Sequence, residues 1–195
     1  DYISKMKKIY RSILIYINND QNASKKLSNL TQLFDKLNIL DNLYDIKAVF
    51  YTILKIANNH YRGPDFFTKI ESILKYFKDE MKDNFTNTEI FSIFKSNKRI
   101  LLYLVKKKII TFDENLIQRI SNRWYSRLGY PEYFAPEIEQ SKGKRERFPE
   151  EFDTLRKEGE NHDDLCEIIR NDSSREFLSY VKKNEIQFDS IIKSS

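Results

Sequence analysis

Apolar residues recur every three or four positions along most of the chain, which is the spacing of one face of an α-helix. Ile3, Met6, Tyr10 and Ile13 begin this series. The 195 residues include only four glycines and four prolines, too few turn-forming residues for a fold of many short strands. The sequence therefore predicts an all-α fold of stacked helical hairpins. We expect helices over residues 3–17, 27–37, 46–57, 64–77, 86–94, 96–107, 111–124, 150–158, 163–170 and 173–183.

Two capping-box patterns mark expected helix starts. Thr86 is followed three residues later by Glu89, and Thr111 by Glu114. In such a box the hydroxyl and the carboxylate each bond to a backbone N–H of the first turn. The pattern predicts that Thr86 and Thr111 each begin a helix.

Part of the chain is repeated. The segment RILLYLVKKKIITFD, residues 99–113, aligns without gaps on REFLSYVKKNEIQFD, residues 175–189, with identical residues at eight of the 15 positions. Ser96 and Asp172 stand at matching places before the two segments, and both are good N-cap residues. We interpret the repeat as an amphipathic helix with a basic last turn, an apolar link, and Phe-Asp at the start of the next helix. Lysines in a last turn face the partial negative charge of unpaired carbonyl groups.

The repeat bears on the three lysines Lys106, Lys107 and Lys108, which alone could be a binding patch or a nuclear address. Asn184 replaces the third lysine in the second copy. A helix end tolerates Asn there, in a left-handed conformation, whereas a charge-based address would lose a charge. The trio is therefore predicted to be the end of a helix.

A change of composition suggests three parts. Residues 128–149 hold three of the four prolines and two of the four glycines, together with a run of charges. We therefore expect an N-terminal helical domain at 1–127, a crossover or linker at 128–158, and an ankyrin-like helical hairpin at 159–195.

Charge and cysteine content limit the functional classes. The net charge of +5 comes from 34 basic and 29 acidic residues, a weaker bias than a dedicated nucleic-acid module shows. Cys166 is the single cysteine, which excludes an intramolecular disulfide and fits a reducing, cytoplasmic location. No apolar run approaches the ~20 residues of a membrane span, so no membrane partner is expected.

Two long segments carry a family resemblance. These are KIANNHYRGPDFFTKIESILKYFKDE at 55–80 and EIFSIFKSNKRILLYLVKKKIITFDENLI at 89–117. They resemble the N-terminal region of a large trichomonad family of ankyrin-repeat proteins, and residues 158–195 look like its junction into the ankyrin array.

The resemblance implies an all-α region followed by stacked ankyrin helix pairs that bind other proteins without catalysis. The usual T-P-L-H-type signature is absent here, so the chain would hold at most one degenerate first repeat. Because the chain begins with Asp1 rather than Met, and because the family continues into repeats, we expect it to be part of a longer protein.

Candidate catalytic and metal-binding residues are few. His162 and Cys166 are four residues apart, so a helix would place a base beside a nucleophile; the alternative is a small residue packed between repeats. His60 could be a metal ligand, but two histidines and one cysteine do not provide three or four ligands in a recognised spacing. No glycine-rich phosphate loop occurs. We expect no cofactor, no metal and no enzymatic activity.

The candidate partner-binding residues lie between positions 124 and 147. One group is aromatic and is either an exposed binding hot spot or the seal at the end of a helical stack. The other is basic and is either a contact for phosphates or an acidic partner, or a solvated linker. The aromatic group is Trp124, Tyr125, Tyr130, Tyr133 and Phe134, and the basic group is Lys142, Lys144, Arg145 and Arg147.

The sequence thus predicts a cytoplasmic protein-interaction scaffold whose partners are other proteins. The alternative is a nucleic-acid-associated protein that uses Lys106–Lys108 and the basic run at 142–147. Nucleic acid is a less expected partner, because acidic residues partly neutralise that run.

Overall fold

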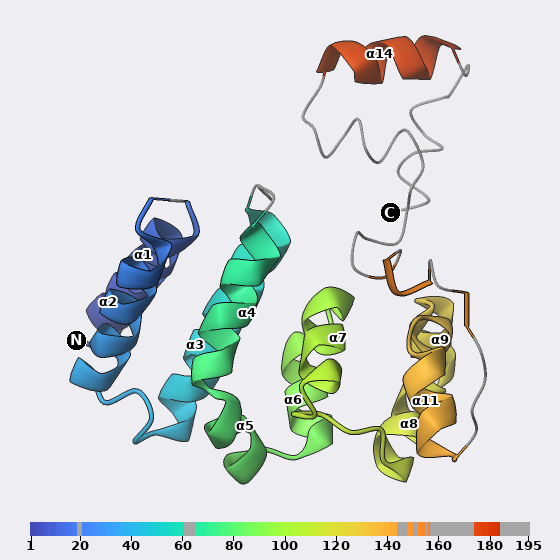
Figure 1. Ribbon diagram of the computed structural model, residues 1–195, viewed down its shortest axis with the longest axis horizontal. Coiled ribbons are helices and arrows are strands. Elements are labelled where there is room, and N and C mark those ends of the chain that lie inside the picture. Colours follow the sequence, from blue (N-terminus) through green and yellow to red (C-terminus); the bar gives the residue numbers. More distant parts are fainter. Residues whose placement is uncertain are drawn as a thin grey trace. The chain divides into compact units, whose positions relative to one another are not determined.

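All regular secondary structure in the described residues is helical, which confirms the all-α prediction (Figure 1). Figure 1 shows the computed structural model, which describes residues 1–18, 21–60, 65–143, 148–149, 152–154, 156 and 174–183. The chain divides into two compact units, Asp1–Phe148 and Pro149–Ser195.

The first unit contains most of the described helices. They are α1 (Tyr2–Ile17), α2 (Ala23–Lys36), α3 (Leu43–Asn59), α4 (Phe66–Tyr76), α5 (Lys78–Asn84), α6 (Asn87–Phe94), α7 (Lys98–Lys106), α8 (Glu114–Ile120), α9 (Arg123–Arg127), α10 (Tyr130–Tyr133) and α11 (Ala135–Ser141).

Side-chain caps set where several of these helices begin. The predicted capping box at α6 is confirmed: the Thr86 hydroxyl accepts from the Glu89 N–H, and the Glu89 carboxylate accepts from the Thr86 N–H. The predicted caps Ser96 and Thr111 are wrong. Asn97 caps α7 instead, and Asp113, the Asp of the repeated Phe-Asp pair, caps α8 through the Leu116 N–H.

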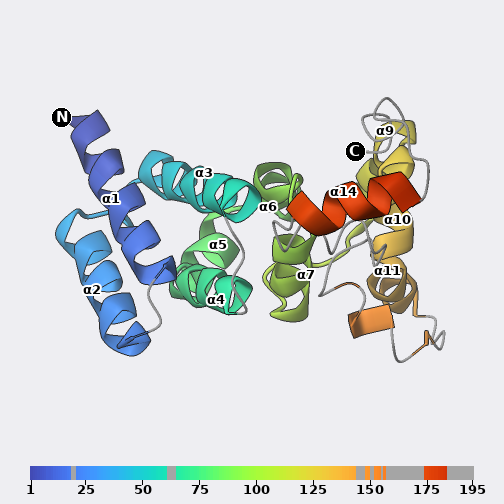
Figure 2. The ribbon, with the colours of Figure 1, turned by 90° about the horizontal axis from the view of Figure 1, so that it is seen from above.

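The helices stack in two layers. Along one layer, α1 contacts α3, α3 contacts α6, and α6 contacts α8, while α2 contacts α4 in the other. Figure 2 shows this arrangement from above, with α1, α3 and α6 on one side and α2, α4 and α7 on the other. The first helices of successive hairpins thus pack on one another, as in helical-repeat proteins.

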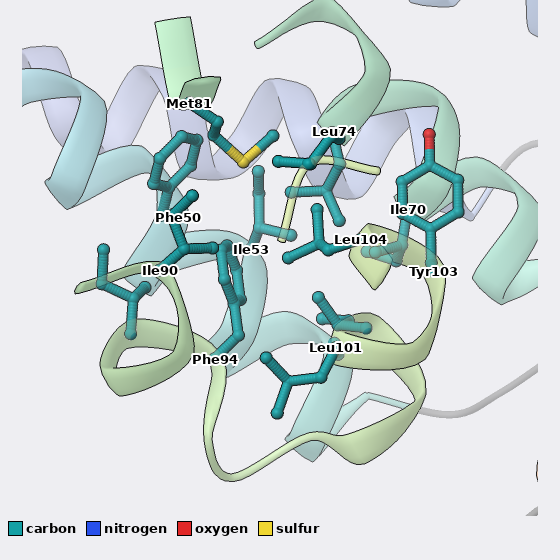
Figure 3. Packing of buried hydrophobic residues seen from close by; sticks show 14 of the residues in the cluster. Phe50, Ile53, Ile70, Leu74, Met81, Ile90, Phe94, Leu101, Tyr103 and Leu104 are labelled. Atoms are coloured by element: carbon teal, nitrogen blue, oxygen red, sulfur yellow. The ribbon is translucent and has the colours of Figure 1, made fainter. Parts of the chain in front are cut away.

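The core between the layers is rich in aromatic rings. The fully buried ring of Phe50 on α3 lies 5.4 Å from that of Phe77, 5.8 Å from that of Phe85 and 5.5 Å from that of Phe94, measured between ring centroids. Figure 3 shows Leu74 of α4 beside Leu104 of α7 in the same cluster. The α3 side chains that the spacing placed on the apolar face fill this core.

Polar contacts join hairpins that are adjacent in the stack. Lys5 of α1 forms an ion pair of 2.6 Å with the buried Asp45 of α3. Lys69 of α4 is buried, and its ammonium group donates a 2.8 Å hydrogen bond to the Ile17 carbonyl at the end of α1. Lys5 thus pairs with a buried carboxylate, and Lys69 bonds to a carbonyl group at a helix end. Both contacts stabilise the packing of one hairpin on the next.

The helices α2 and α7 end in the same way. The residue after each C-cap, Asn38 or Lys108, has a left-handed backbone with φ of +50° or +54°. The next residue, Ile39 or Ile109, is buried and donates its N–H back to the helix. This is the Schellman end of a helix, and it confirms that Lys106, Lys107 and Lys108 close α7.

In the segment 128–158 that was predicted as a crossover or linker, helices continue as far as α11, and the boundary between the two units lies within this segment, after Phe148. Pro131 and Pro136 occupy the first turns of α10 and α11, where no intrahelical donor is needed. Gly129 caps α10 with a φ of +65°. Two of the three prolines and one of the two glycines that suggested a linker are therefore helix-start signals.

The second unit contains α14 (Ser174–Lys183). The two copies of the repeat are offset by 76 residues, so the positions that match α7 are 174–182. The helix α14 covers these positions, so the helical part of the repeat agrees with the structure. The expected helix at 163–170, the remaining part of the ankyrin-like hairpin, and Asp172 and Asn184 lie outside the described residues.

Candidate functional site

The aromatic group proposed from the sequence is mostly core. Tyr125, Tyr130, Tyr133 and Phe134 are all buried. The ring of Phe91 on α6 lies 5.4 Å from that of Tyr125 and 5.6 Å from that of Tyr130, edge to face. These four side chains seal the packing of α9 and α10 against α6, and they offer no large surface to a partner.

A cation reinforces this seal. Lys98, in the first turn of α7, places its ammonium group 5.1 Å from the ring centre of Tyr130 and 5.3 Å from that of Tyr133. Such contacts attract the cation to the ring face. The cluster therefore positions α10 against the start of α7.

Trp124 differs from the rest of its group, because 67% of it is exposed. Asn122 accepts hydrogen bonds from the N–H groups of both Trp124 and Tyr125 and so fixes the start of α9. Consecutive helical residues point about 100° apart, and burial of Tyr125 therefore turns Trp124 outward. Leu128, one turn later, is 48% exposed.

The basic candidates divide between described and undescribed residues. Lys106, Lys107 and Lys108 are exposed at the end of α7, and the Lys107 ammonium lies 5.9 Å from the Tyr103 ring centre. Lys142 forms an ion pair of 2.9 Å with Glu139. Lys144, Arg145 and Arg147 lie outside the described residues.

Two exposed tyrosines on α3 were missed by the sequence reasoning. Tyr44 is 82% exposed and Tyr51 is 54% exposed. They are seven positions apart, so they lie on one face of the helix, which is not the face that carries Ile46 and Phe50. The sequence did contain a signal: the two aromatic residues have the spacing of one helix face, and that face is not the apolar one.

Of the candidate catalytic and metal-binding residues, His60 lies in the described part of the chain. His60 ends α3, and its Nε2 lies 3.1 Å from the Tyr10 hydroxyl of α1, a hydrogen bond between neighbouring helices. His162 and Cys166 lie outside the described residues. Among the residues that the structure describes, no three His, Cys, Asp or Glu side chains gather as metal ligands.

The perturbed pKa values also have structural causes. Hydrogen bonds from the Thr86 backbone and side chain, with help from Lys47, lower the pKa of Glu89 in the capping box. Burial raises the pKa of Tyr76, as does its hydrogen bond to Asp35 of α2. Burial likewise raises the pKa of Tyr103.

One groove lies between α1 and α2. Its volume of about 200 Å³ is below the ~300–1,000 Å³ of typical small-molecule sites. It is lined by Ser12, Ile15, Tyr16, Lys26, Asn29 and Leu30. This lining contains no pair of side chains suited to acid–base or nucleophilic chemistry.

No described helix combines the length and the apolarity that crossing a bilayer requires. Comparison with known proteins adds no relative: no protein-family model, curated protein or solved structure matches this chain.

Proposed function

We propose that the chain is a non-catalytic scaffold for protein–protein interaction, and that it forms the N-terminal part of an ankyrin-repeat protein. The observation that supports this most is the exposed pair Tyr44 and Tyr51 on α3. The stacked hairpins support it as a framework, and the likeness of α14 to α7 supports a repeated unit. The cytoplasmic location stays a prediction.

The position of α3 makes its tyrosines suited to binding. This helix lies between α1 and α6 in its layer, and its opposite face is fixed in the core by Phe50. Tyr44, Tyr51 and the exposed Lys55 follow at intervals of seven and four residues, along one stripe. Tyrosine offers a large contact area with few rotatable bonds, so it loses little entropy on binding.

The test is cross-linking from this stripe. The photoreactive residue p-benzoylphenylalanine replaces Tyr51 in the full chain, and in a second protein it replaces Lys75, which is exposed on α4 in the other layer. We expect a protein partner to cross-link from position 51 and not from position 75. Excess wild-type chain should compete, whereas a Tyr44→Ala, Tyr51→Ala competitor should not.

Both alanine substitutions remove exposed side chains, so the double variant should keep its helical circular dichroism spectrum. Equal cross-linking from the two positions, or equal competition by the double variant, would contradict the proposal. Cross-linking to RNA or DNA with a steep linear dependence on log salt would instead support the nucleic-acid alternative.

A further inference from the structure

The short helix α9 carries a second exposed surface, made of Arg123, Trp124, Arg127 and Leu128. Trp124 and Leu128 are one helical turn apart and are 67% and 48% exposed. Arg127 lies three residues after Trp124, and Arg123 lies one turn before Arg127, both exposed. We call these four residues the α9 surface. An apolar pair thus stands beside two guanidinium groups.

The charged residues along the chain next to the α9 surface are basic. Residues 115–131 contain three arginines and no Asp or Glu. Within the described part of the chain, neither Arg123 nor Arg127 forms an ion pair, and the exposed Glu132 of α10 pairs with neither of them. These guanidinium groups therefore remain available for carboxylates of another molecule.

The residues beneath the α9 surface are packed and hydrogen-bonded. Tyr125, between the exposed residues, is buried against Phe91 and Tyr130 with ring centroids 5.4 and 5.3 Å away. Asn122 holds the first turn through two backbone N–H groups. Trp and Arg are the residue types that dominate binding energy at protein interfaces.

We propose that the α9 surface binds an acidic segment of a partner protein, in which an aromatic or aliphatic side chain packs on Trp124 and Leu128 while flanking carboxylates pair with Arg123 and Arg127. This inference rests on the proposed scaffold function and names a partner chemistry for it. Arginine pairs with carboxylates through two parallel hydrogen bonds, which gives the contact direction as well as attraction.

Nucleic acid is the less suitable occupant. Single strands need a basic groove that follows several phosphates, with aromatic rings for successive bases. The α9 surface offers one exposed ring and an aliphatic neighbour, and its two arginines lie one turn apart. That geometry matches a short peptide with one anchor side chain.

Trp124 is the only tryptophan in the sequence, so its fluorescence reports directly on this surface. The probe is the tryptophan-free peptide acetyl-Glu-Glu-Leu-Phe-Glu-Glu-amide, added to the full chain. We expect the emission of Trp124 to shift to the blue and its quenching by acrylamide to fall, because the peptide covers the ring. Three further probes are the same peptide with Lys for every Glu, the acidic peptide with Ser for Leu and Phe, and oligothymidylate, all of which should bind more weakly.

The variant Arg123→Gln, Arg127→Gln should bind the acidic peptide at least about tenfold more weakly, because both charge pairs are lost. The matched control Lys7→Gln, Lys8→Gln removes two exposed charges from α1 and should bind as the wild type does. Equal weakening in both variants would show a general charge effect and would overturn the proposal. So would a stronger response to the basic peptide or oligothymidylate, or no response to any probe.

The two proposals fail separately. Cross-linking from position 51 depends on the α3 stripe, whereas the fluorescence of Trp124 depends on α9. Partner capture at Tyr51 without peptide binding at Trp124 would leave the scaffold function intact and remove this inference. If neither signal appears, both fail.

Discussion

At the scale of single residues, asparagine side chains connect the hairpins. The Asn97 amide donates to Asn58 at the end of α3 (2.8 Å), while its oxygen accepts from the Ile100 N–H (3.0 Å). Asn87 at the start of α6 donates to Asp113 (2.7 Å) ahead of α8 and accepts from the Thr111 N–H (3.1 Å). An amide both donates and accepts, so one side chain can cap its own region and hold the next hairpin.

Replacing Asn97 by Ala should therefore be costly. The change removes the cap of α7 and the hydrogen bond to Asn58 from a side chain that is itself only 6% exposed. We expect the free energy of unfolding to fall by about 1–3 kcal/mol. Urea denaturation measures it, with the exposed Asn29→Ala as control. Equal losses in the two variants would contradict the connecting role.

Glu89 should make stability depend on pH. The Thr86 hydrogen bonds lower its pKa in the folded state from the ordinary value near 4.5. The stabilisation is therefore present above that ordinary value and disappears as the pH falls through the lower folded pKa. We expect Glu89→Gln to be less stable than wild type at neutral pH, with the difference vanishing in strong acid. Thermal unfolding of both proteins from pH 7 downward tests this, and a constant difference would contradict it.

At the scale of secondary-structure elements, the ends of helices decide how consecutive helices meet. The left-handed residues Asn38 and Lys108 turn the chain so that Ile39 and Ile109 enter the core. Lysine is an unfavourable residue in this conformation, because its Cβ crowds the backbone, whereas Asn tolerates it better and Gly does best. The helix α7 therefore keeps a strained end.

Substitution of Lys108 by Gly should stabilise the protein. The free energy released by relief of the left-handed strain exceeds the cost of the extra entropy of the unfolded chain. We expect the free energy of unfolding to rise by about 0.5–1 kcal/mol. The matched change Lys106→Gly, two residues earlier inside α7, should cost about 0.5–1 kcal/mol. Chemical denaturation of the two variants distinguishes them, and a loss of stability in Lys108→Gly would contradict the helix-end assignment.

At the scale of the whole molecule, the first unit is a stack in which each hairpin covers its neighbour. Phe50 of α3 contacts rings from the end of α4, the end of α5 and from α6, so its burial depends on three other segments. The adjacent Tyr51 faces outward and is 54% exposed. One helix thus provides core on one side and a candidate binding stripe on the other.

These neighbouring residues allow a sharp comparison. Phe50→Ala should lower the free energy of unfolding by about 3–5 kcal/mol, because it leaves a cavity among rings that are packed around it. Tyr51→Ala should change it by less than about 1 kcal/mol. Differential scanning calorimetry measures both. A large loss from Tyr51→Ala would mean that its ring is structural, and would weaken the proposed function as well.

Much of the element order follows from the sequence because local rules govern it. The helical period and the box at Thr86 predict α1 to α4, α6 and α7 closely, since backbone bonding and capping involve residues only a few positions apart, whereas the short helix α5 was not predicted. The repeat predicted the end of α7 for the same reason. The same rules predicted Ser96 and Thr111 as caps, and these predictions are wrong. The observed caps are Asn97, one residue later, and Asp113, two residues later.

By itself, the sequence determined that the chain is helical and that Lys106, Lys107 and Lys108 end a helix. Only the tertiary structure decided which aromatic residues are available to a partner. Trp124 and Tyr125 are adjacent and both aromatic. Trp124 is exposed, whereas Tyr125 is packed against Phe91, which is distant in the chain. Exposure depends on what other segments cover, and residues far apart in sequence supply that cover.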